Sequence, residues 1–287
     1  MGISRRTFLR IAGATGVAGA ATGAYVFGIE PIWLRTVRHE VPIEGLDPRL
    51  DGFRIAQLSD LHVGAGVPLD YLREAVDRAL SLEPDAIVMT GDFVHRGGQT
   101  GAVRDACKAV EGLRAPLGTF GVLGNHDHGV YNASRRVAPA GGGMVKESLG
   151  AAGVRILSNT STLLQRPDGA AVRLAGFADL WSGGFDPTAL PRAPSHKTIA
   201  LSHNPDTAPE VARQTDASLI LCGHTHGGQV SIPFMGPPIL PIRLRKFAAG
   251  PYDLGSARLY VNRGVGWLRR VRLFVRPEVT LHVLRVG

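Results

Sequence analysis

Short apolar runs recur along the chain from about Ile43 to Gly287, separated by polar and glycine-rich turns. Eight of them have the length and composition of buried strands: FRIAQLS, AIVMTG, GTFGVLG, VRLAGFA, TIALSH, SLILCG, RLYVNRG and EVTLHVL. Between several of them, apolar residues recur at helical spacing, which predicts helices in LDYLREAVDRALSLEP, AVRDACKAVEGL, MVKESLGAAG and APEVARQT. Strands that alternate with helices predict an α/β fold with a mainly parallel or mixed sheet. We expect one continuous domain over residues 43–287.

The first 29 residues have a different pattern. The chain opens with MGISRRTFLR, and an uncharged stretch of small and apolar residues follows from Ile11 to Ile29. A charged head before an apolar core is typical of an export signal. The heptapeptide SRRTFLR resembles the twin-arginine signal, which implies the twin-arginine export machinery as a partner. We therefore expect residues 1–29 to direct export to the periplasm or the outer face of the membrane. This segment is either cleaved or retained as an anchor.

The net charge of +8 is concentrated at the two ends of the chain. Residues 1–40 contain five arginines and two acids, and residues 241–287 contain ten Lys or Arg and two acids. The middle, residues 41–240, is slightly acidic. A nucleic acid partner would require a basic face on the main body, so this distribution argues against one. The basic C-terminal section could instead attract an anionic substrate or anionic lipid headgroups.

Polar residues that can bind metals follow directly after five of the predicted strands. In α/β sheets, sites form beyond the carboxyl ends of the strands, so we expect these residues to converge on one cleft. Six of the ten histidines lie in these tips. The residues are Asp60 and His62, Asp92, Asn125 to His128, His203, and His224 with His226.

The chemistry of this set indicates divalent metals. Carboxylate, carboxamide and imidazole ligands suit Mn²⁺, Fe or Zn²⁺, and the two cysteines are too few for a cysteine metal site. The ligands are too numerous for one four-coordinate ion. Two neighbouring ions require a bridging carboxylate and can act together in phosphoryl transfer.

Taken in order, the five blocks resemble the motifs of the calcineurin-like metallophosphoesterases: Asp60-Leu61-His62, Gly91-Asp92, Gly124-Asn125-His126-Asp127, His203 and Gly223-His224-Thr225-His226. GFADLWSGG, LSHNPD and the ending RGVGWLRRVRLFVRPEVT resemble the exported YkuE-like branch of that family. The resemblance implies a four-layer α/β/β/α sandwich of two mixed sheets. It also implies a dimetal-dependent phosphoester hydrolase, acting on diesters or monoesters, in which a hydroxide that bridges the ions attacks phosphorus.

The resemblance also implies a role for each residue. Asp60, His62 and His226 would hold one ion, and Asn125, His203 and His224 the other. Asp92 would bridge the two ions. His126 would face the substrate and protonate the leaving oxygen, and Asp127 would orient His126.

Three other functions remain open at this stage. A membrane-associated lipid-sugar pyrophosphate hydrolase would use the same cluster with a different pocket. A non-catalytic scaffold should lack one of these residues, whereas all of them are present. A nuclease would need a basic groove, which the acidic middle does not favour. We expect a monomer that acts in the cell envelope on a phosphoester substrate, which could be lipid-linked.

Several residues outside the blocks have two interpretations. His95 could line the cleft, and His128 suits a supporting or solvent-exposed position better than a substrate contact. Asp179 and Trp181 could shape the substrate pocket or a structural turn. Apolar and basic residues alternate from Leu268 to Val275, which predicts a strand with one solvated basic face or a patch that faces a membrane. We expect His39, His196 and His282 to lie on the surface.

Overall fold

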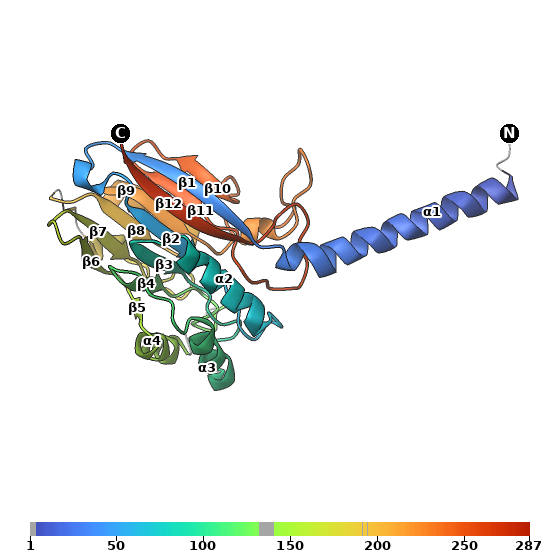
Figure 1. The fold of residues 1–287 in the computed structure, drawn as a ribbon, viewed down its shortest axis with the longest axis horizontal. Coiled ribbons are helices and arrows are strands. Elements are labelled where there is room, and N and C mark those ends of the chain that lie inside the picture. The colour runs from blue at the N-terminus through green and yellow to red at the C-terminus, as the bar shows by residue number, and fades with distance from the viewer. Residues whose placement is uncertain (1–3, 132–140, 191, 194) are drawn as a thin grey trace.

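Figure 1 shows the computed structural model of the protein, which describes residues 4–131, 141–190, 192–193 and 195–287. One long helix, α1 (Arg5–Ala24), extends away from a folded α/β body. Within the described ranges, the body contains four further α-helices: α2 (Leu69–Ser81), α3 (Thr100–Ala109), α4 (Gly142–Ala151) and α5 (Ala208–Gln214). All four coincide with segments in which the sequence predicts helices.

The body is built on two six-stranded sheets of the described chain. The first sheet has the order β1-β12-β2-β3-β4-β5, and β2 to β5 run parallel. It comprises β1 (Arg35–Ile43), β12 (Glu278–Val286), β2 (Arg54–Leu58), β3 (Ala86–Thr90), β4 (Thr119–Val122) and β5 (Val154–Ile156). The second sheet has the order β10-β11-β9-β8-β7-β6, with β11, β9, β8 and β7 parallel. It comprises β10 (Gly250–Asp253), β11 (Arg258–Val261), β9 (Ala217–Cys222), β8 (Thr198–Leu201), β7 (Ala171–Gly176) and β6 (Thr160–Gln165).

The two sheets pack face to face, which confirms the predicted α/β sandwich of two mixed sheets. Alternate residues of a strand point to opposite faces, so Ile55 of β2 joins a core between the sheets that also contains Leu219 of β9. Ala56 on the other face packs in a second core with α2, α3 and α4, which Figure 1 shows along one side of the first sheet. The outer face of the second sheet is covered by α5 and by an irregular segment that includes Phe247.

The four strands that the apolar pattern did not predict are β1, β5, β6 and β10. They are the outermost strands of the two sheets. Edge strands have one neighbour only and keep polar residues toward solvent. In β1, for example, exposed and half-buried residues alternate over the first six positions, so this strand lacks the continuous apolar run that marks the inner strands.

The folded body begins earlier than the sequence predicts. β1 starts at Arg35 and pairs in parallel with β12, so the expected domain start at Ile43 is too late. Val26, Glu30 and Leu34 are already buried against the body. The segment 1–29, predicted to be a separate signal, therefore includes residues that pack with the domain at its C-terminal end.

The strand predicted from Leu268 to Val275 is absent, and the prediction that His282 lies on the surface is wrong. Residues 268–275 form no strand; they run as an irregular loop with one bridge, between Leu273 and Val230. The Arg272 guanidinium is buried and donates to the backbone carbonyls of four residues, Arg263, Gly264, Gly266 and Val275. His282 is buried as well, because its strand β12 lies inside the first sheet. His39 and His196 are half-buried.

Candidate metal centre

The ends of the inner strands bring the predicted site residues together. β2, β3 and β4 run parallel in the first sheet, and β8 and β9 run parallel in the second. Their carboxyl ends therefore meet at one edge of the sandwich. Each predicted residue is at most 8% exposed. The set comprises Asp60, His62, Asp92, Asn125, His126, Asp127, His203, His224 and His226.

The ligand atoms divide into two groups. In the first group, the Nε2 atoms of His62 and His226 are 2.9 Å apart, and Asp60 Oδ1 is 3.4 Å from His226 Nε2. In the second group, His203 Nε2 is 3.0 Å from His224 Nδ1 and 3.2 Å from Asn125 Oδ1. Such close approach of nitrogen and oxygen donors toward shared points is typical of metal ligands.

The Asp92 carboxylate lies between the two groups. Its Oδ2 is 3.5 Å from His62 Nε2 and 3.2 Å from His203 Nε2. Its Oδ1 accepts a hydrogen bond of 2.9 Å from the backbone N–H of His126. One carboxylate oxygen can thus reach a cation in either group.

The backbone beneath this cluster is held in a conformation that residues other than glycine rarely adopt. Positive φ angles at functional sites store strain that the surrounding structure must support. Five of the predicted ligands have such angles: Asp60 (55°), His62 (48°), Asp92 (53°), His224 (70°) and His226 (49°). The chain also approaches itself closely here, because a Cβ atom on Gly124 would collide with the Asp92 carboxylate. This geometry directs several polar side chains into one small volume.

The ionisation states of His62, His224, His226 and Asp92 suit a cation, whereas burial raises the pKa of the Asp60 carboxyl to about 7. Burial lowers the pKa of His224 to about 3 and those of His62 and His226 well below their ordinary value. Burial also opposes ionisation of Asp92, but the surrounding imidazoles, with His203 first, hold its pKa well below the usual range. Neutral imidazoles and ionised carboxylates are the forms that bind metals.

The pKa of His203 is raised by the neighbouring Asp92 carboxylate, which indicates that the site attracts positive charge. Burial alone would lower its pKa, but the facing Asp92 carboxylate outweighs that effect and raises the pKa to about 10. A proton on His203 thus neutralises Asp92 in the absence of another cation. The donor set fits divalent metals in both charge and ligand type. Within each of two groups, the donor atoms lie within 4.8 Å of one another. One group is Asp60, His62 and His226, and the other is Asp92, His203 and His224.

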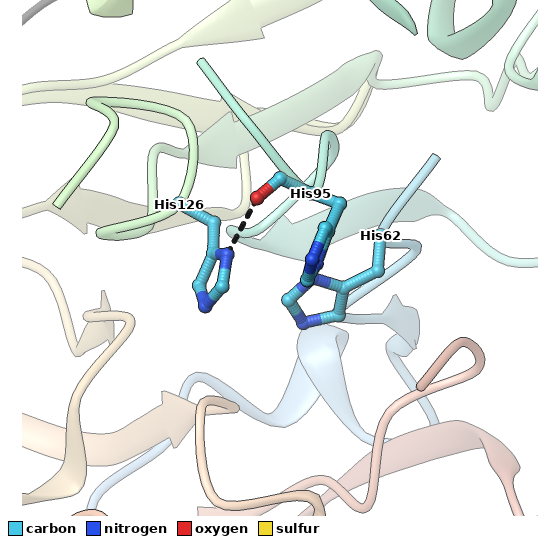
Figure 2. Close-up of side chains that lie close together, drawn as sticks. All are labelled: His62, His95 and His126. Carbon is cyan, nitrogen blue, oxygen red and sulfur yellow. Dashed lines mark hydrogen bonds between the residues drawn. The ribbon is translucent and has the colours of Figure 1, made fainter. Parts of the chain in front are cut away.

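His126 is held by a backbone carbonyl, not by Asp127. Its Nδ1 lies 2.7 Å from the carbonyl oxygen of His95, and Figure 2 draws this contact as a dashed line. The Asp127 carboxylate instead accepts hydrogen bonds from the backbone N–H groups of Val94 and Gly124. The prediction that Asp127 orients the His126 ring is therefore wrong. Asp127 braces the turn next to His95 instead.

Comparison with known proteins agrees with this arrangement. Residues 53–228, more than half of the chain, match the calcineurin-like phosphoesterase family. The chain belongs to the calcineurin-like phosphoesterases.

Similar proteins cover almost the whole chain. It is 34% identical to phosphodiesterase YaeI of Escherichia coli over 97% of this chain and 98% of that protein. It is 32% identical to the uncharacterized metallophosphoesterase YkuE of Bacillus subtilis, over 99% and 98%. The UDP-2,3-diacylglucosamine pyrophosphatase LpxG of Chlamydia trachomatis is 29% identical, over 92% and 93%. The predicted resemblance is thus confirmed, and the protein is a hydrolase of phosphoester bonds.

In this phosphoesterase, a cavity of about 550 Å³ opens beside His126. The sequence left the position of His95 open, and the structure places it in the lining with its ring 5.1 Å from that of His126. Arg96, Gln99 and Tyr131 also line the cavity. Sequence reasoning missed these three because none belongs to a motif, although Arg96 and Gln99 closely follow Asp92 in the chain.

The remaining candidates lie at the border of the site. The Trp181 ring stands edge-on to the His224 imidazole, with 4.6 Å between the ring centroids. Asp179 is buried and accepts a hydrogen bond from Ser182 N–H, as in a structural turn. His128 is half-buried, and its ring packs closely against Gly142 at the start of α4.

Proposed function

We propose that the protein uses two divalent ions to hydrolyse a phosphodiester in the cell envelope. Asp60, His62 and His226 would hold one ion, and Asn125, His203 and His224 the other, with Asp92 shared. The observation that carries this assignment is the position of the Asp92 carboxylate, whose Oδ2 is within 3.5 Å of a histidine nitrogen of each group. Mn²⁺, Zn²⁺ and Fe all fit these ligands. When bound, such a pair of ions lowers the pKa of a bound water and neutralises charge on phosphoryl oxygens.

The protein's own residues would position the substrate and move one proton. The contact between His126 Nδ1 and the His95 carbonyl requires that Nδ1 carries a proton, since the carbonyl can only accept. Nε2 is then the nitrogen that can donate a proton to the leaving oxygen when the ring is protonated. The exposed guanidinium of Arg96, in the same cavity, can attract a phosphate or another anionic group of the substrate.

A lipid-linked pyrophosphate is the second candidate substrate. The name of the LpxG relative states that it cleaves a diacylated sugar nucleotide. In this chain, the segment Arg5–Ile32 is long and apolar enough to cross a membrane, by length and composition. Its place at the N-terminus of a phosphoesterase would bring the enzyme to amphiphilic substrates. A non-catalytic scaffold is disfavoured because the complete ligand set converges in one buried cluster.

Metal removal tests the proposed activity. We expect the purified protein to contain about two divalent ions per chain, to lose activity with a chelator, and to regain it with Mn²⁺ or Zn²⁺. Rates should be compared on an aryl phosphodiester, an aryl phosphomonoester and a diacylated sugar-nucleotide pyrophosphate. A higher kcat/KM for the lipid pyrophosphate than for the diester would select the second candidate. Full activity without bound metal would refute the dimetal proposal.

We also propose that the twin-arginine route exports the folded protein. Arg5 and Arg6 lie in the first turn of α1 and are exposed, as a signal that a receptor reads must be. Replacing both with lysine keeps the charge but removes the planar guanidinium groups. The double variant should accumulate inside the cell, as measured by fractionation and immunoblotting, whereas the exposed control Arg38→Lys should be exported normally. Normal export of the double variant would rule out this route.

A further inference from the structure

An apolar rim lies beside the metal centre, formed by two loops that the catalytic assignment does not use. In the loop after His226, Phe234 is fully exposed, Met235 is 80% exposed and Ile239 is 76% exposed. In the C-terminal loop, Phe274 is 64% and Leu268 38% exposed. Large exposed apolar groups gathered in one place usually mark an interaction site. We use "apolar rim" for these five residues.

Hydrogen bonds join the two loops into one surface. Leu273 forms an isolated bridge with Val230, and its carbonyl accepts from Ser231 N–H at 2.9 Å. The side chain of Gln229, which is 8% exposed, donates to the carbonyls of Arg269 and Val271 at 2.7 and 2.8 Å. The rim is therefore a supported feature of the fold and not a pair of independent loops.

The rim is continuous with the base of α1. Arg272 N–H donates to the Val26 carbonyl at 3.1 Å, and Val275 N–H donates to Glu30 Oε1 at 2.6 Å. The Arg276 guanidinium lies over the Trp33 ring, 3.8 Å from its centroid. Figure 1 shows the C-terminal loop beside the point where α1 leaves the body.

The length of the apolar segment determines where this base would lie in a membrane. The uncharged stretch Ile11–Ile29 has 19 residues, about 28 Å at 1.5 Å per helical residue, close to the thickness of a bilayer core. The chain then enters the body directly, because Glu30, Pro31 and Leu34 are buried. An inserted α1 thus leaves no linker that could hold the rim away from the lipid.

The charges around the rim complement anionic lipid. Residues 226–250 and 262–277 together contain eight Lys or Arg and no acid, although Arg272 is buried and Arg263 pairs with Glu278. Arg245, Arg269 and Arg270 are exposed. The Arg245 side chain donates to the carbonyls of Pro237 and Pro238 in the loop after His226. Exposed basic residues beside apolar ones are typical of surfaces that dock on anionic bilayers.

We propose that the apolar rim inserts into the interface of an anionic phospholipid bilayer next to the outer end of α1. The loop after His226 returns to the site at its C-terminal end, where the Pro241 carbonyl lies 3.2 Å from His224 Nε2. Docking therefore places the metal centre beside the lipid headgroups. The docking proposal rests on the apolar rim and its charges and not on the proposed catalytic function, and its test requires no catalytic activity.

Tryptophan fluorescence of the full chain in vesicles tests this docking. Phe234→Trp places a reporter at a position that is fully exposed, so the replacement leaves the core unchanged. Interfacial side chains reach about 5–10 Å into the headgroup and acyl boundary. After subtraction of the parent spectrum, we expect the introduced tryptophan to show blue-shifted emission in phosphatidylglycerol vesicles and quenching by brominated acyl chains. The matched control is Leu163→Trp. Leu163 is 50% exposed and lies on β6, the edge strand of the second sheet opposite to β10, so this variant should show neither effect.

Charge neutralisation provides the second measurement. Each basic residue near an anionic surface contributes about 1 kcal/mol, a factor of about five. Arg269→Gln with Arg270→Gln in the Phe234→Trp background should weaken docking about 25-fold in phosphatidylglycerol vesicles and much less in phosphatidylcholine. Unquenched, water-like emission of the Phe234→Trp reporter in both vesicle types would overturn the proposal. A blue shift that depends on protein concentration without lipid would also overturn it, in favour of a second copy of the chain.

Discussion

Asp92→Ala should empty both metal positions and reduce phosphoester hydrolysis by about 10³-fold or more. The Asp92 Oδ2 atom is the donor placed within 3.5 Å of both His62 Nε2 and His203 Nε2, so its loss affects both groups together. Metal charge stabilises the transition state by several kcal/mol, and each 1.4 kcal/mol corresponds to a factor of ten in rate. The measurements are metal content by mass spectrometry and the rate on an aryl phosphodiester.

Two further variants separate charge from shape. Asp92→Asn keeps an oxygen that can accept from His126 N–H but removes the negative charge, so it should lose metal while retaining the fold. The control Asp70→Ala removes a carboxylate whose side chain is 96% exposed on α2, and it should keep both ions and full activity. Two tightly bound ions in Asp92→Ala would reject the shared position of this carboxylate.

His126→Ala should keep both ions and lose activity according to the leaving group. Loss of a general acid costs on the order of 10²–10⁴-fold, and poor leaving groups need the proton most. Alkyl phosphodiesters should therefore suffer the full loss, whereas aryl esters, which leave as stabilised anions, should retain more activity. His224→Ala, by contrast, should lose an ion and fail on every substrate alike.

The structure also defines how this second prediction could fail. His62, His95 and His126 lie close enough together to hold a metal ion themselves, so an ion lost from His126→Ala would make His126 a ligand. An equal loss along the leaving-group series would leave it with an electrostatic role only. The neighbouring His128→Ala is the matched control. Its ring packs against Gly142 at α4, and we expect nearly unchanged rates.

The interior of the fold was predictable from local pattern because each inner strand is buried on both faces. β3, for instance, is buried at all five positions and reads as an unbroken apolar run. The edge strands escaped prediction because solvent permits polar residues there. β6 is buried at only one of its six positions, so its sequence lacks the continuous apolar run by which the inner strands were predicted.

Convergence of the site residues was predictable for a related reason. Each block follows directly after a buried strand, and parallel strands end at the same edge, so local sequence and one topological rule were enough to bring Asp60, Asp92 and His224 together. The individual metal roles stay predictions. Family resemblance, not spacing, supplied the division of the ligands between two ions.

Residue sequence alone thus determined the α/β class, the family and the cluster at the strand ends, because these depend on periodicity and on short motifs. Tertiary structure decided what depends on partners far away in the chain. Arg272 matches the alternating pattern of a solvated strand, yet its guanidinium is buried because the Arg263, Gly264 and Gly266 carbonyls converge on it. The Asp127 carboxylate, which follows β4, likewise accepts a hydrogen bond from the backbone N–H of Val94, which follows β3. Such contacts depend on packing in three dimensions, which leaves no periodic pattern in the sequence.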